Sequence, residues 1–111
     1  MPPKLDDKEQ LALREFRKAL EKAFGNDLLE VKLFGSKARG DARKDSDLDV
    51  LVVISSGDWR MRDVVYGIVT DILLEGDVCI SPKVISKAHY DRLREAESPF
   101  IGNVIRDGVP V

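Results

Sequence analysis

The first part of the chain shows two successive patterns of apolar and polar positions. Over residues 5–24, apolar side chains recur at helical spacing while Lys, Arg and Glu fill most of the other positions. This pattern predicts an amphipathic helix, closed by Gly25 and Asn26. From residue 29 to residue 33, apolar and polar side chains alternate, which predicts a strand with one solvated face that ends at Gly35.

The middle of the chain holds its most continuous apolar segment. After Asp49, the residues up to Ile54 are all aliphatic and mostly β-branched, as in a strand buried on both faces, so we expect this strand at the centre of a sheet. Gly57 and Asp58 then open a second helix, in which apolar residues repeat at intervals of three and one over residues 61–73. We expect that stripe to pack on the sheet.

The last third of the chain predicts one strand and two helices. A strand over residues 78–85 contains Pro82, which cannot donate a ladder hydrogen bond, so this strand belongs at a sheet edge. Ser86 caps a third helix, and Ser98, followed by proline, opens a short fourth helix that ends before Gly108. The apolar stripe of the fourth helix either closes the core or stays partly uncovered.

These elements follow one another in the order αββαβαα. The predicted fold class is α+β, an α/β sandwich in which helices pack on a mixed sheet of three strands. At 111 residues, we expect a single domain over residues 1–111, large enough to bury a core.

Composition narrows the possible partners and the compartment. The chain has 18 basic and 20 acidic residues and a net charge of -2, so nucleic acid is not indicated as a ligand. No apolar run approaches the roughly 18 residues that a membrane helix needs, and the first ten residues lack the apolar core of a signal peptide. The only cysteine, Cys79, is expected to be a small core residue, and a reducing cytoplasm is the expected location.

Two carboxylates stand at the start of the central strand, in the segment "SDLDVLVV". Because residues i and i+2 of a strand point to the same side about 6.6 Å apart, Asp47 and Asp49 are expected to project together. Desolvating unpaired carboxylates costs free energy or raises their pKa values. Oxygen ligands of this kind suit Mg²⁺, which often binds substrate phosphates as well. The pair therefore predicts a magnesium site.

A glycine and a serine precede this pair in "FGSKARG". Gly35 lets the backbone approach a ligand without a Cβ atom, and Ser36 can cap a short helix whose free N–H groups favour an anion. We therefore expect phosphate binding beside the magnesium site.

The segment "GSKARGDARKDSDLDVLV" resembles the signature of the DNA polymerase β nucleotidyltransferase superfamily, and more narrowly that of the minimal nucleotidyltransferases (MNT). The predicted order of elements agrees with that group over nearly the whole chain. The resemblance implies two Mg²⁺ ions bound by Asp47 and Asp49, and a triphosphate held by Gly35 and Ser36. It also implies a third carboxylate on the next strand, for which Asp77 is the matching position.

The resemblance implies a reaction as well. A hydroxyl acceptor would attack the α-phosphate of a nucleoside triphosphate, with ATP the expected substrate, and pyrophosphate would leave. Asp77 is the candidate that ligates one ion and helps to deprotonate the hydroxyl. Lys37 and Arg39 are assigned to phosphate binding; the alternative that Arg39 pairs with Asp41 or Asp45 stays open.

The resemblance suggests a partner as well as a substrate. Small nucleotidyltransferases of this type are commonly paired with an α-helical HEPN protein, so the expected function is that of an antitoxin that nucleotidylates its toxin. One alternative is a catalytically idle module that occludes its partner. Another is a subunit that modifies a small molecule such as an aminoglycoside, for which the chain lacks the added acceptor domain. A homo-oligomer is also open.

Overall fold

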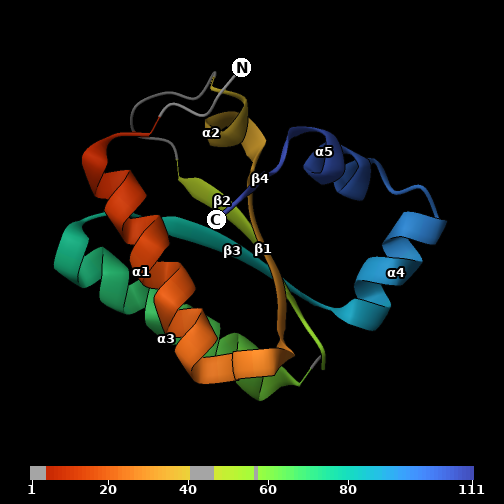
Figure 1. The fold of residues 1–111 in the computed structure, drawn as a ribbon, viewed down its shortest axis with the longest axis horizontal. Helices are drawn as coiled ribbons and strands as arrows, with labels where there is room; N and C mark the ends of the chain where they lie inside the picture. The colour runs from red at the N-terminus through yellow and green to blue at the C-terminus, as the bar shows by residue number, and fades with distance from the viewer. Residues whose placement is uncertain (1–4, 41–46, 57) are drawn as a thin grey trace.

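The computed structural model describes residues 5–40, 47–56 and 58–111, and it shows a mixed sheet between two layers of helices (Figure 1). The fold class predicted from the sequence is therefore confirmed. The elements run in the order α1 (Asp7–Phe24), the 3₁₀ turn η1 (Gly25–Asp27), β1 (Leu28–Phe34), α2 (Gly35–Arg39), β2 (Leu48–Ile54), α3 (Trp59–Gly76), β3 (Ile80–Ser86), α4 (Lys87–Glu95), α5 (Pro99–Asp107) and β4 (Val109–Pro110).

The strands lie side by side in the order β3-β2-β1-β4. β2 pairs antiparallel with β1 and parallel with β3, and β4 pairs antiparallel with β1. The predicted central position of β2 and the edge position of β3, which carries Pro82, are both confirmed. The sequence predicted three strands; the fourth, β4, is only two residues long and one of them is Pro110, so it shows no period-two pattern.

Helices cover both faces of the sheet (Figure 1). α1 and α3 pack on one face, where Phe16 and Leu20 of α1 and Val65 of α3 are fully buried. α4 and α5 pack on the other face, with Ile101 at the centre of a second, smaller cluster. β2 contributes to both clusters: its even-numbered residues from position 48 to position 54 belong to the first, and Leu51 and Val53 belong to the second.

The second cluster shows whether the apolar stripe of α5 is covered. Ile101 and Val104 of α5 are each 1% exposed, and the rings of Phe34 and Phe100 meet edge to face at a centroid distance of 5.4 Å. The apolar stripe of α5 thus closes the core, although Ile105 remains half exposed.

Three local expectations are wrong in detail. α1 begins at Asp7 instead of residue 5, because Asp6 caps it. Leu29 is half exposed, because the β1–β2 register shifts between Leu28 and Glu30 and takes Leu29 out of the alternation. On α3, most of the predicted stripe packs on the sheet as expected: Val65 and Ile72 are buried, and the residues at positions 61, 68 and 69 pack against the same core cluster. Two members of the stripe, Val64 and Leu73, are exposed instead.

No helix within the described ranges is long and apolar enough to cross a membrane.

Candidate active site

The two aspartates of the central segment lie at the start of β2. Asp49 is the second residue of that strand and is partly buried, and Asp47 directly precedes the strand and is exposed. Leu48 lies between them, and its side chain points to the other face of the sheet, where it belongs to the core cluster formed with α1 and α3. Partial burial raises the pKa of Asp49 most, the negative charge of Asp47 raises that pKa further, and the Arg39 guanidinium lowers it. The two carboxylates are therefore close enough to repel one another, as the sequence predicted.

Gly35 lies directly against the second of these carboxylates. Antiparallel pairing places Phe34 opposite Asp49, and the chain turns at Gly35 with φ +76°. A Cβ atom on Gly35 would stand 2.5 Å from Oδ2 of Asp49, well inside van der Waals contact. Both the backbone angle and the available space require glycine at this position.

The residues after Gly35 form the short helix α2. The expected short helix is present, but the expectation that Ser36 caps it is wrong: Ser36 is the second residue of the helix, and the N-cap is Phe34, which makes no side-chain capping bond. Arg39 ends the helix, and its charge acts on Asp49, so it lies on the side of the carboxylates. Lys37 is buried, with its ammonium 2.8 Å from Oε2 of Glu9 in α1. The candidate partners of Arg39 at positions 41 and 45 lie outside the described residues.

Asp77 lies at the end of α3, where it is the C-cap with φ 57° and its N–H donates to the Leu73 carbonyl. It lines a cavity of about 250 Å³ between α1 and α3 that also includes Lys8 and Glu15. Among the residues that the structure describes, no three His, Cys, Asp or Glu side chains form a group that could hold a metal ion. The structure therefore does not bring Asp77 together with Asp47 and Asp49 in such a group.

Cys79, directly before β3, and Ser81, within β3, lie beside the carboxylates. Parallel pairing sets Asp49 beside Ser81, and the N–H of Leu48 donates to the Cys79 carbonyl at 3.1 Å. Cys79 is exposed, so the expectation of a core residue is wrong. Partial burial, the charge of Asp47 and a side-chain hydrogen bond with Asp47 raise the pKa of the thiol, in that order of size.

The pattern of residues along β2 and β3 does not predict this neighbourhood, because it does not reveal the parallel register of the two strands. The only available signal was the even spacing of positions 77, 79 and 81, which places alternate residues on one face.

The donor set fits a hard divalent cation. Asp47 and Asp49, at alternate positions at the start of β2, carry oxygen atoms that could bind such a cation. Partial burial and the charge of Asp47 raise the pKa of Asp49, and a cation between the two carboxylates would offset their repulsion. The absent Cβ at Gly35 leaves the backbone close to the Asp49 carboxylate.

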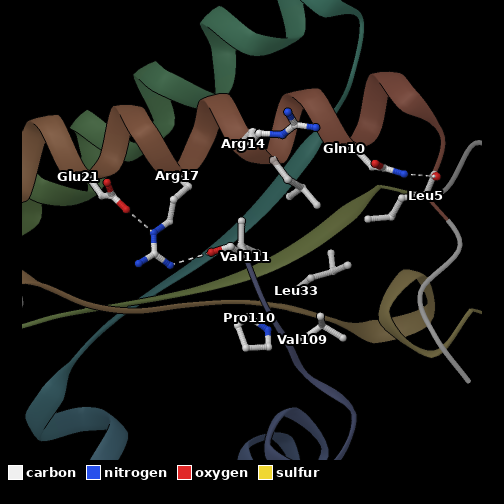
Figure 2. Close-up of a pocket in the computed structure, with 10 residues that line it drawn as sticks. Leu5, Gln10, Arg14, Arg17, Glu21, Leu33, Val109, Pro110 and Val111 are labelled. Carbon is white, nitrogen blue, oxygen red and sulfur yellow. Dashed lines mark hydrogen bonds and ion pairs between the residues drawn. The ribbon is translucent and has the colours of Figure 1, made fainter.

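A separate cavity of about 480 Å³ lies away from these aspartates, between α1 and the strands β1 and β4 (Figure 2). In it, Arg17 joins α1 to the residue that follows β4: its Nε donates to Glu21 in the same helix, and its guanidinium donates to the Val111 carbonyl oxygen at 2.8 Å. Leu33 and Val109 line its apolar wall. Its lining carries none of the residues predicted to bind metal or phosphate.

Residues 13–101 match the family model for the nucleotidyltransferase domain, and the chain belongs to this family. It is a nucleotidyltransferase, as the resemblance implied. A curated relative, "Putative protein adenylyltransferase MJ0604" of Methanocaldococcus jannaschii, is 34% identical over 100 residues, which cover 90% of this chain and 94% of the relative.

Solved structures agree with the family. One described as "Structure of putative minimal nucleotidyltransferase" has a TM-score of 0.56 and 27% identity, and the match covers 96% of this chain and 97% of that one. A toxin-antitoxin structure with AMP-PNP shares the fold, with a TM-score of 0.54 at 20% identity, over 86% of this chain and 68% of that one. The resemblance to minimal nucleotidyltransferases is confirmed.

Proposed function

We propose that this chain transfers AMP from ATP to a hydroxyl group on a partner protein and thereby acts as an antitoxin. The observation that carries the proposal is the carboxylate pair at the start of β2 with the backbone of Gly35 against Asp49. The relative named as a protein adenylyltransferase supports a protein acceptor, and a toxin-antitoxin protein of the same fold supports the antitoxin role.

In this proposal, Asp47 and Asp49 hold Mg²⁺, with two ions expected, and the backbone at Gly35 and Ser36 holds the triphosphate. Bound Mg²⁺ would neutralise charge on the phosphate oxygens and on the leaving group. Arg39 lies beside Asp49, where its guanidinium can contact a phosphate oxygen. Water exclusion by the neighbouring side chains would strengthen each of these charge interactions.

The reaction forms one bond and breaks one. The acceptor oxygen bonds to the α-phosphorus as the bond from that phosphorus to the bridging oxygen breaks, and pyrophosphate leaves. The hydroxyl proton passes to a carboxylate, and Asp77 stays our candidate for that role. Since Asp77 lies at the end of α3, it would have to approach the pair in the complex. Asp77→Asn should then abolish transfer but leave ATP binding intact; equal loss of both would contradict the role.

The proposed partner is a helical HEPN-type toxin. A single nucleotidyltransferase domain over residues 1–111 would be the catalytic core, acting in the cytoplasm where ATP and Mg²⁺ are available. A homo-oligomer is compatible with this proposal and is not required by it.

The test is transfer of label from ATP marked at the α-phosphate to the co-purifying partner, with Mg²⁺ present. The informative variant carries Asp47→Asn and Asp49→Asn together. Asp71→Asn, which changes an exposed aspartate of α3, is the matched control, because it removes the same kind of charge at a position to which the proposal gives no role.

We expect labelled partner with the wild type and with Asp71→Asn, and none with the double variant. No label in any sample, with a stable complex and full suppression of the toxin in cells, would overturn the catalytic proposal in favour of an occluding module. Label on a small molecule such as an aminoglycoside, with none on protein, would overturn the acceptor.

A further inference from the structure

In the described part of the chain, two charged residues are buried, Glu9 and Lys37, and they pair with each other. Their side chains are 11% and 4% exposed, and Nζ of Lys37 lies 2.8 Å from Oε2 of Glu9. Burying charges is costly unless they are paired and hydrogen-bonded. No buried side-chain nitrogen or oxygen among these residues lacks a hydrogen-bond partner, so the charges are satisfied where they lie.

The Glu9 carboxylate joins two elements through its two oxygens. Oε1 accepts a hydrogen bond from the Asp6 N–H at 3.1 Å, which completes the capping box at the start of α1. Oε2 bonds the ammonium of Lys37 in α2. The side chain of Lys37 is therefore held at a helix end that is itself fixed by hydrogen bonds.

α2 needs such an anchor. A helix of five residues is too short to be stable alone, and its N-cap, Phe34, makes no side-chain capping bond. Gly35, the first residue of α2, adds backbone freedom in the unfolded chain. The ion pair of Lys37 joins α2 to α1, and the methyl group of Ala38 is buried in the core.

We propose that Glu9 and Lys37 are positioning residues that hold α2 so that Gly35 and Ser36 face the carboxylates of β2. Lys37 then acts on nucleotide binding through the placement of the backbone, and its ammonium contacts Glu9 instead of a phosphate. This inference rests on the proposed function, because it assigns triphosphate binding to Gly35 and Ser36.

The test compares Lys37→Met with Glu9→Gln. Methionine keeps the apolar stem of Lys37 without its charge, and glutamine keeps an oxygen for the Asp6 N–H. If the pair positions α2, each variant should weaken ATP binding in Mg²⁺ about tenfold and raise KM more than it lowers kcat. The double variant should bind no more weakly than either single one, since one shared contact is lost.

Other outcomes would overturn the proposal. Loss of binding in Lys37→Met with wild-type binding in Glu9→Gln would mean that the ammonium itself contacts the nucleotide. Wild-type binding in both variants would mean that the pair only stabilises the fold. Arg17→Met, which breaks the more exposed Arg17–Glu21 pair on the same helix, is the matched control and should leave ATP binding unchanged.

A second measurement separates this inference from the proposed function. The N–H of Gly40 donates to the Ser36 carbonyl at 3.0 Å, so its hydrogen exchange reports the integrity of α2 without any nucleotide. Exchange should rise at least tenfold in Glu9→Gln, in a protein whose circular dichroism shows that it is folded. Unchanged exchange would overturn the positioning role. Failure of the wild type to bind ATP would overturn the proposed function and leave the exchange result to stand.

Discussion

Gly35 and Asp49 form a contact that only glycine permits: a Cβ atom at position 35 would lie 2.5 Å from Oδ2 and 3.3 Å from Cγ of Asp49. The pairing of Phe34 with Asp49 across β1 and β2 sets this approach. The turn at the end of one strand and the carboxylate at the start of the next are thus parts of a single arrangement.

Gly35→Ala should lower the transfer rate about 100-fold, because the added methyl displaces the Asp49 carboxylate by an ångström or so. It should also lower the free energy of unfolding by about 1 to 2 kcal/mol, since alanine is strained at φ +76°. Chemical denaturation and the labelled-ATP assay measure the two effects.

Gly102→Ala is the control for this substitution. Gly102 lies within α5, and a Cβ atom there would meet no atom within 4 Å. Alanine at position 102 should raise the free energy of unfolding by roughly 0.5 to 1 kcal/mol and leave transfer unchanged. Equal losses of activity in the two variants would contradict the steric explanation.

Asp49→Asn should stabilise the protein at pH 7 in the absence of metal while abolishing transfer. The pKa of Asp49 is raised in the folded state, so its contribution favours folding below the unfolded pKa and is lost as the pH rises through the folded pKa. At pH 7 the ionised side chain opposes folding. Asparagine removes that penalty, for a gain of roughly 2 to 4 °C in melting temperature.

Thermal unfolding in EDTA as a function of pH checks this prediction. The difference between Asp49→Asn and the wild type should be greatest at neutral pH and should vanish as the pH falls below the usual aspartate range. A variant at position 49 that melts below the wild type at pH 7 would contradict the burial and repulsion argument.

Asp47→Asn should speed the alkylation of Cys79. Partial burial, the charge of Asp47 and their hydrogen bond raise the pKa of this thiol, and the thiolate is the reactive form. Removing the negative charge should increase the rate with iodoacetamide severalfold at pH 7.5. At a pH high enough to ionise Cys79 in both the wild type and the variant, the alkylation rates of the two proteins should converge. Because the chain has one cysteine, mass spectrometry of the intact protein follows the reaction at this site, and equal rates at pH 7.5 would refute the contact.

Phe16→Ala should cost about 3 to 5 kcal/mol of unfolding free energy, because the ring is fully buried between α1 and the sheet. Trp59→Ala removes a larger side chain that is 65% exposed, and should change the stability by no more than about 0.5 kcal/mol. Urea denaturation of the two variants compares them directly. A large loss at position 59 would mean that the indole is covered in solution.

The main elements of the fold were predictable because their signals are local. The unbroken aliphatic run of β2 indicated a central strand, and Pro82 indicated the edge. The features that were missed depend on tertiary contacts. The register shift that exposes Leu29 and the pairing of β4 with β1 have no periodic signature.

In the candidate site, too, some features follow from local sequence and others depend on tertiary contacts. The adjacency of Asp47 and Asp49 follows from strand geometry alone, and the structure agrees with it. The environment of Lys37 does not follow from its own segment, because the partner that buries it, Glu9, lies 28 residues earlier. Likewise, the strand after Asp77 was predicted to begin at Val78, because that residue is apolar, but β3 begins at Ile80.

Both outer strands of the sheet carry a proline. Pro82 lies in β3 and Pro110 in the two-residue β4, and β3 also carries the exposed Lys83. A proline offers no N–H to an incoming chain, and a charged edge disfavours it further. The sheet is therefore a poor template for strand addition. Self-association into fibrils is disfavoured along both edges, and we expect a protein that binds this chain to contact side chains on its helices and turns.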